Sequence, residues 1–363
     1  MRQGGPRIVG YLTFLGVLVA TGGLAAAAPV TTCNAGTFVV DAGNAALVAQ
    51  NGYNNSSCNL VIQATLPSGP MVLNLVITAK SIAITGNGGD VEIINTKTNS
   101  TIRFTAAAGN ISLFKAVVKA HKTMNFKCTS PAGGPDCTFV ADSSEIVVAS
   151  DFALPLGCGG VLRIETAGDV TFASTFVHGG DAWEVFSTKG NIAIGPCGAD
   201  GDGCTDPLLS KRPPQCFNAQ GQFIGCTVQF TTENELRSVC FPPGQEQPCN
   251  GGCKEKRFQA KNGGIDITGT TITSKEHITF WCGPGGLQGA GSTILSDDKV
   301  LIDCTTGPSL GGNIDLTNAT ISGLNGPATA GTTLRTDPPS TITCTGGTFN
   351  PAPVETPPSA TCP

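Results

Sequence analysis

Apolar and polar residues alternate in a short phrase that recurs along the chain. The phrase is glycine, a small polar residue or a second glycine, Ile or Val, any residue, and then an apolar residue. It begins at Gly89, Gly109, Gly168, Gly190, Gly263 and Gly312. Alternation with a period of two is typical of a β-strand that buries one face. We therefore expect a series of similar strands, each opened by a glycine that gives the backbone freedom for a sharp corner.

The similarity between the copies extends beyond the phrase. Nine residues after the glycine, a β-branched residue follows in four copies, at Val118, Val177, Ile272 and Ile321. Two copies also lead, nineteen residues after the glycine, to the cysteine of Phe126-Lys127-Cys128 and of Phe280-Trp281-Cys282. The same apolar-x-Cys ending recurs at Leu156-Gly157-Cys158, Ile302-Asp303-Cys304 and Ile342-Thr343-Cys344. One unit thus contains two or three short strands within about twenty residues.

A unit of this size cannot bury its apolar residues alone, so the units must stack, with each strand pairing to its counterparts above and below. The pattern predicts an all-β protein, a right-handed parallel β-helix (β-solenoid) with a cysteine-rich insertion. An antiparallel β-sandwich also has short alternating strands. It does not explain a phrase that returns with the same offsets.

The Gly-Asn-Ile-x-Leu phrases resemble the repeats of filamentous-haemagglutinin-type adhesins and related bacterial right-handed β-helix proteins. The resemblance covers about residues 80–194 and 258–322 and rests on a degenerate motif. It implies a stacked β-solenoid and a surface or adhesive role, and it transfers no functional residue to this chain.

The N-terminus has the three regions of a secretory signal peptide. Arg2 and Arg7 precede the apolar run Ile8–Ala20, and Ala25 and Ala27 occupy the small-residue positions before a cleavage site. No later segment approaches the roughly 20 apolar residues that a membrane-spanning helix needs. We therefore expect a secreted or extracellular protein, with the periplasm as an alternative location.

The repeat and its interruptions divide the chain into five parts. We expect a signal peptide (1–27), an N-terminal part of the β-helix (28–194), a cysteine-rich, disulfide-stapled insertion (195–257), a C-terminal part of the β-helix (258–334) and a Pro/Thr-rich tail (335–363).

The 16 cysteines all follow the expected cleavage site, and an even number in an exported chain predicts a disulfide framework. Cys282 and Cys304 end comparable strands about one coil apart, so stacking would bring them within disulfide distance. Cys128 with Cys137, Cys33 with Cys58, and Cys344 with Cys362 are expected as local loops. The insertion holds seven more: Cys197, Cys204, Cys216, Cys226, Cys240, Cys249 and Cys253. Because seven is odd, we expect at least one of them to pair with the body, unless one remains free.

The charge of the chain limits the classes of partner that we expect it to bind. The formal net charge is −5 and only 13% of residues are charged. Binding to a phosphate backbone needs clustered Lys and Arg, so nucleic acid is not an expected partner. The one dense basic run, Lys254-Glu255-Lys256-Arg257, is interpreted as a solvated loop.

Catalytic and metal-binding candidates are sparse, and we assign no catalytic, cofactor-binding or metal residue. The carboxylates nearest to a paired site are at Asp297-Asp298, Arg163-Ile164-Glu165 and His178-Gly179-Gly180-Asp181, and none forms the residue set of polygalacturonases. Asp266 and Asp315 share an outward repeat position, which we interpret as a solvated polar column. The histidines are His121, His178 and His277, and no Gly-x-Ser-x-Gly phrase occurs. Asp200–Asp206 resembles part of a Ca²⁺ loop but lacks its opening aspartate and closing glutamate, so we interpret it as an acidic turn.

Three classes of function are compatible with these features of the sequence. The first is a non-enzymatic, structural, surface-associated or adhesive module that contacts a polysaccharide or a cell-surface component, with the insertion as its recognition element. The second is a polysaccharide-active lyase or hydrolase of the same fold, which requires a groove with converging carboxylates and an Arg or Lys. The third is an inhibitor-like or signalling cysteine-knot protein whose function lies wholly in residues 195–257.

Overall fold

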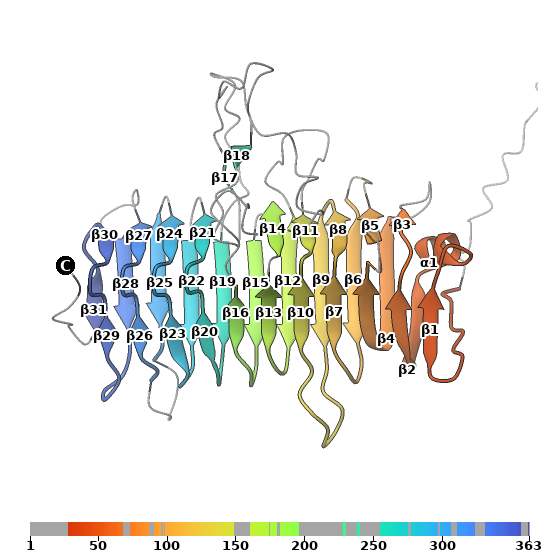
Figure 1. Cartoon of the computed structure of the whole chain (residues 1–363), viewed down its shortest axis with the longest axis horizontal. Coiled ribbons are helices and arrows are strands. Elements are labelled where there is room, and N and C mark those ends of the chain that lie inside the picture. The colour runs from red at the N-terminus through yellow and green to blue at the C-terminus, as the bar shows by residue number, and fades with distance from the viewer. Residues whose placement is uncertain are drawn as a thin grey trace, which may run out of the picture.

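The chain forms one elongated stack of β-strands, in which successive coils follow one another along the long axis (Figure 1). The computed structural model describes residues 28–67, 73–86, 91–95, 97, 99–148, 160–173, 175–179, 182–195, 228–229, 238–239, 255–274, 277–296, 298–305, 311–323, 331–356 and 362. Strands of neighbouring coils pair in parallel, as between β7 and β10 or β19 and β22. The predicted all-β parallel β-helix is therefore confirmed.

Each full coil contributes a strand to three ladders. Ladder 1 includes the strands that follow five of the six glycine phrases, β7, β13, β16, β20 and β26. Its members are β1 (Thr37–Val40), β2 (Tyr53–Ile62), β4 (Asn74–Thr85), β7 (Ile111–Phe114), β10 (Phe139–Asp142), β13 (Val170–Ala173), β16 (Ile192–Ile194), β20 (Gly264–Asp266), β23 (Gly286–Gln288), β26 (Ile314–Asp315) and β29 (Ile342–Thr343). Ladder 2 comes next along the chain: β3 (Leu66–Pro67), β5 (Val91–Asn95), β8 (Ala116–Ala120), β11 (Glu145–Val148), β14 (Phe176–Gly179), β21 (Thr271–Ser274), β24 (Thr293–Ser296), β27 (Thr320–Gly323) and β30 (Thr348–Asn350).

Ladder 3 completes the coil. Its strands are β6 (Thr101–Ala106), β9 (Thr123–Cys128), β12 (Val161–Thr166), β15 (Ala182–Ser187), β19 (Glu255–Ala260), β22 (His277–Cys282), β25 (Lys299–Asp303), β28 (Gly331–Arg335) and β31 (Val354–Thr356). The long strands β2 and β4 turn the corner between ladders, so their first halves belong to ladder 3 and their second halves to ladder 1.

The core is a set of apolar columns that run along the solenoid. Inward residues of ladder 1 lie in register from coil to coil and are all buried: Phe38, Leu60, Ile82, Ile111, Phe139, Val170, Ile192, Ile265, Leu287, Ile314 and Ile342. Val118 and Val177, each nine positions after its phrase glycine, belong to a second column in ladder 2, with Ile146 stacked between them. Burial of one such side chain contributes about 1.5–3 kcal/mol.

The phrase glycines are required by close approach of adjacent coils, and this differs from the sequence expectation. None of Gly109, Gly168, Gly190, Gly263 or Gly312 has a left-handed φ. A Cβ on Gly190 would instead lie 2.3 Å from the carbonyl carbon of Gly168, and a Cβ on Gly263 would lie 2.1 Å from the carbonyl oxygen of Gly190. The glycines therefore stack on one another's backbones at the corner before ladder 1.

In three copies of the phrase, the asparagine that follows the glycine joins one coil to the next. The side-chain oxygen Oδ1 of Asn110 accepts a hydrogen bond from the backbone N–H of Thr138 at 2.9 Å. Asn191 does the same for the N–H of Gly264 at 2.8 Å, and Asn313 for the N–H of Thr341 at 2.9 Å. These bonds satisfy backbone donors at the corner, where the ladder hydrogen bonds are interrupted. They explain why the phrase favours Asn or Asp after glycine.

Two repeat copies lie in other ladders than their sequence suggested. The phrase at Gly89 leads into β5 of ladder 2, where Ile93 pairs with Val118. Likewise, Ile342-Thr343-Cys344 belongs to ladder 1, because Ile342 pairs with Ile314. Both errors have one cause, since an alternating strand has the same pattern on every side of a solenoid.

The solenoid also continues beyond residue 334, although the sequence predicts a Pro/Thr-rich tail from residue 335 onward. Strands β29, β30 and β31 pair with β26, β27 and β28, so the last coil extends to Thr356.

At the other end of the solenoid, α1 (Ala45–Asn51) occupies the ladder 2 position of the first coil and buries Val48 and Ala49. Among the described residues, no helix is long and apolar enough to cross a membrane.

The cysteine-rich insertion leaves the solenoid after β16 and rejoins it at β19. No ladder 2 strand is described between β14 and β21, so the insertion starts where such a strand would follow. Between Gly195 and Glu255, the described residues are those of β17 (Val228–Gln229) and β18 (Ser238–Val239), which pair antiparallel above this gap (Figure 1).

The basic run at the end of the insertion is not a solvated loop, because its last residues begin β19. Lys256 points inward and is fully buried, and its Nζ lies 4.1 Å from the centre of the Trp183 ring on β15. The face of an indole ring attracts a cation most strongly when water is excluded. The inward column of ladder 3 therefore contains a lysine side chain that stacks on Trp183.

Candidate functional site

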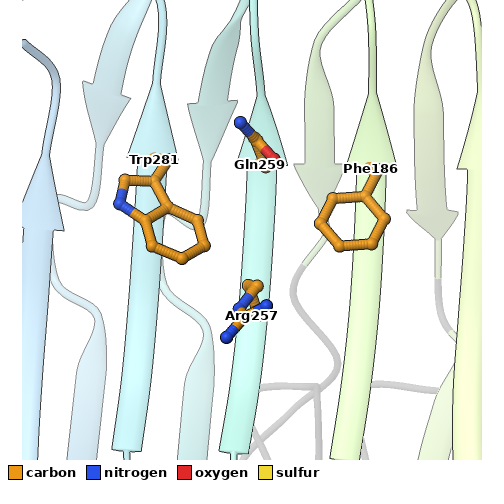
Figure 2. Close-up of a pocket in the computed structure, with 4 residues that line it drawn as sticks. All are labelled: Phe186, Arg257, Gln259 and Trp281. Atoms are coloured by element: carbon orange, nitrogen blue, oxygen red, sulfur yellow. The ribbon is translucent and has the colours of Figure 1, made fainter. Parts of the chain in front are cut away.

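A shallow hollow of about 370 Å³ lies on the outer side of ladder 3. Phe186, Arg257, Gln259 and Trp281 line it (Figure 2). They come from the three consecutive strands β15, β19 and β22. All four side chains are partly exposed, so the hollow offers aromatic and polar groups to solvent together.

Strand alternation places these side chains outside. Their neighbours Val185, Phe258 and Phe280 point inward and are buried in the column of ladder 3. Phe186 pairs in register with Gln259, and Gln259 pairs with Trp281, so the three form one row along the solenoid axis. Figure 2 shows the two rings nearly face-on, on either side of β19 with Gln259 and Arg257.

A guanidinium group lies near each of the two rings. Cζ of Arg257 lies 5.1 Å from the centre of the Trp281 ring, and Cζ of Arg163 lies 5.7 Å from the centre of the Phe186 ring. A cation within about 6 Å of an aromatic ring contributes about 0.5–1 kcal/mol at exposed sites. Each ring of the hollow therefore has a cationic neighbour.

An ion-pair network adjoins the hollow on β9, β12 and β15. Arg163 bridges two carboxylates: its Nε contacts Glu165, and its Nη1 lies 3.2 Å from Oε2 of Glu184. Nζ of Lys127 lies 3.0 Å from the other oxygen of Glu165. Partial burial raises the pKa of the Glu165 carboxyl, but the hydrogen bonds and positive charges of Lys127 and Arg163 outweigh it. The pKa therefore lies below its ordinary value of 4.5.

This lowered pKa predicts a pH-dependent contribution to stability. Because ionised Glu165 is favoured in the folded state, its stabilisation is present above the unfolded-state pKa and is lost as pH falls through the folded-state pKa. We expect Glu165→Gln to be less stable than the parent at about pH 7 by up to about 1 kcal/mol, since the pair is partly exposed. The difference should begin to shrink as pH falls below about 4.5 and should vanish once pH is below the lowered folded-state pKa. Urea unfolding across this range measures it.

A matched control is Glu92→Gln on β5, a partly exposed glutamate without an ion pair among the described residues. It should show no such pH-dependent difference. Equal behaviour of the two variants would contradict the role of the Lys127–Glu165–Arg163 network.

The aspartates of the shared repeat position do not form a paired-carboxylate site. Asp266 and Asp315 lie in one outward column of ladder 1, with Gln288 between them. Oδ1 of Asp266 accepts the backbone N–H of Thr268 at 3.0 Å, and Oδ1 of Asp315 accepts that of Thr317 at 3.0 Å. Each carboxylate thus closes its own turn.

The described histidines are separate from the hollow's lining. His121 is buried, and Nδ1 of His277 lies 3.0 Å from Oδ2 of Asp298. The side chain of His178, together with Asp181 and Asp297, lies outside the described residues. So do the expected signal peptide (1–27), the Asp200–Asp206 turn, Cys158 and the seven insertion cysteines.

Four disulfides are described, and they join the cysteines named from the sequence. Their Cα–Cα distances are 5.9 Å for Cys33–Cys58 and for Cys128–Cys137, 4.4 Å for Cys282–Cys304 and 4.6 Å for Cys344–Cys362. The Cys282–Cys304 bond links adjacent coils of ladder 3. These bonds fit an oxidising environment.

One group of potential metal ligands is described at the C-terminal end. Ligand atoms of Cys344, Glu355 and Cys362 lie within 4.8 Å of one another. A cysteine binds metal as a thiolate, and the two sulfurs are joined in a disulfide. We therefore assign this group a structural role in fastening the end of the chain.

The hollow was not found from the sequence, although Phe280-Trp281-Cys282 was recognised as a repeat ending. The available signal was a large aromatic residue at an outward position of an alternating strand, which occurs at both Phe186 and Trp281. Their proximity was hidden, because Phe186 and Gln259 pair across the insertion.

Comparison of the chain with known protein families, with curated proteins and with solved structures finds no match.

Proposed function

We propose that the chain is a secreted, non-enzymatic β-helix protein that binds an extracellular polysaccharide through the hollow on ladder 3. The observation that carries the proposal is the pairing of two partly exposed aromatic rings with an amide and a guanidinium in one row of the solenoid. Sugar-binding sites need aromatic faces for the apolar side of the ring and polar groups for its hydroxyls.

The proposed location rests on the N-terminal signal pattern and on the disulfides. The resemblance of the repeat to filamentous-haemagglutinin-type adhesins supports a surface-associated, adhesive role. A rigid solenoid suits such a role, because each coil adds a fixed increment to an extended face. The insertion rejoins the solenoid at β19, the central strand of the hollow, and we include it as a second recognition element.

Binding is favoured over polysaccharide cleavage by the chemistry of the hollow. Its four lining residues carry no carboxylate, whereas glycoside hydrolysis uses a pair of carboxyl groups flanking the scissile bond. The nearby Glu165 and Glu184 are both engaged by Arg163. A carboxylate held in an ion pair, with a pKa below its ordinary value as at Glu165, is poorly suited to act as a general acid.

The test is retention of the purified protein on a panel of insoluble and soluble polysaccharides. We expect at least one to bind, and Trp281→Ala to weaken that binding about tenfold, which corresponds to about 1.4 kcal/mol. The matched control is Phe114→Ala, which removes another exposed aromatic residue with a nearby cation, on β7 of ladder 1.

The same incubations distinguish binding from catalysis. Reducing ends and unsaturated products are measured in parallel with retention. Turnover would contradict the non-enzymatic assignment. Absence of binding to every polysaccharide, or equal losses for Trp281→Ala and Phe114→Ala, would contradict the proposed site.

A further inference from the structure

The row that crosses the hollow has a defined length and direction. From Phe186 to Gln259 is one ladder step and from Gln259 to Trp281 is another. Neighbouring strands lie about 4.8 Å apart, so the two aromatic positions are separated by about 9.6 Å along the solenoid axis. The row is perpendicular to the strands and belongs to a straight part of the stack (Figure 1).

We propose, resting on the proposed function, that the ligand is a neutral, extended, β-linked glycan that lies along the solenoid axis. One pyranose ring stacks on Phe186, the next lies over Gln259, and the third stacks on Trp281. Equatorial linkages make a flat ribbon in which every second ring presents the same face. Two ladder steps match two sugar units of such a ribbon, whereas a coiled α-linked chain curves away from one of the rings.

The polar groups between the rings suit hydroxyls. The amide of Gln259 offers both a donor and an acceptor and has no hydrogen bond to another residue in the described part of the chain. Arg257 lies beside it on the same strand and adds donors only. A sugar hydroxyl both donates and accepts, so the middle unit can engage both side chains.

Carboxylates at both ends of the row favour a neutral ligand. Glu165 pairs in register with Phe186, and Asp303 pairs with Trp281. The order along the axis is therefore acid, aromatic, amide, aromatic, acid. Glu165 is already paired with Lys127 and Arg163, and Nη1 of Arg335 lies 3.9 Å from Oδ2 of Asp303. A chain of uronic acids would have to displace these carboxylates from their cations, whereas neutral hydroxyls would not.

The experiment measures affinity against ligand length by titration calorimetry. The probes are β-1,4-linked gluco-oligosaccharides of two to six units, with α-1,4-linked gluco-oligosaccharides and oligogalacturonates of equal length as comparisons. We expect affinity to rise about tenfold from two to three units, because three units are needed to cover both rings, and to level off afterwards. The α-linked and acidic series should bind at least about tenfold more weakly.

Variants assign the length dependence to the two rings. Phe186→Ala and Trp281→Ala should each abolish the rise between two and three units, while Phe114→Ala should keep it. Circular dichroism and unfolding midpoints establish that each variant is folded.

Two outcomes would overturn this inference and leave the proposed function intact. One is an affinity in the parent that does not change with ligand length, and the other is preferred binding of α-linked or acidic chains that still depends on Trp281. Absence of any Trp281-dependent glycan binding would overturn the proposed function itself.

Discussion

Replacing Phe126 with alanine is expected to lower the free energy of unfolding by about 3–5 kcal/mol, the usual cost of truncating a buried Phe. Phe126 is fully buried in ladder 3. Its ring stacks on Phe104 with a centroid distance of 5.2 Å and contacts Phe139 of ladder 1 at 5.0 Å. Phe139 in turn lies 5.7 Å from Phe172. The substitution therefore opens a cavity in an aromatic cluster that joins two ladders.

Chemical denaturation followed by circular dichroism measures this loss, and hydrogen exchange of the β9 amides localises it. Local measurement matters because the cooperativity of a long repeat array can break down, and then a single unfolding free energy does not describe the chain. Phe114→Ala is the control, since that ring points outward and is 41% exposed. Its effect should stay within about 0.5 kcal/mol. If both variants lost a similar free energy of unfolding, the aromatic cluster would not stabilise the core more than an exposed ring does.

The fold was predictable because the residues that repeat along the sequence are those whose side chains face the core. The Ile or Val residues of four phrases, Ile111, Val170, Ile265 and Ile314, lie in one column, as stacking of the repeat units predicts. The ladder of an individual strand was less predictable, as Ile93 shows by pairing with Val118 instead of joining that column. Alternation reports which face of a strand is buried, but not which side of the solenoid the strand occupies.

The candidate site was hidden for a different reason. Its residues point outward, where the repeat imposes no pattern, and its central strand is separated from β15 by the insertion. Ala182 pairs with Glu255, so after the insertion the chain rejoins the solenoid in the coil directly next to β15. Sequence spacing cannot specify such a pairing, because loop-closure entropy changes little with loop length and insertions of many sizes are tolerated.

The register across the insertion depends instead on the glycine corner, and Gly263→Ala should therefore be among the most disruptive single substitutions. The new Cβ would lie 2.1 Å from the carbonyl oxygen of Gly190 and 2.6 Å from its carbonyl carbon. Both are backbone atoms, so relief requires the coils to separate. We expect destabilisation at the upper end of the overpacking range, about 3 kcal/mol, measured by urea unfolding.

Gly195→Ala is the matched control, because its Cβ would meet only the carbonyl oxygen of Phe172 at 3.2 Å and the Cα of Ala173 at 3.7 Å. Hydrogen exchange should accelerate at β16 and β20 in the Gly263 variant and remain near the parent rate in the Gly195 variant. Since β19 lies between β15 and β22, loosening this corner should also weaken glycan retention at the hollow. Equal stability of the two variants would show that coil contact at the glycines does not set the register. If the Gly263→Ala variant lost stability but retained glycan as well as the parent does, the glycine corner would not determine the geometry of the binding row.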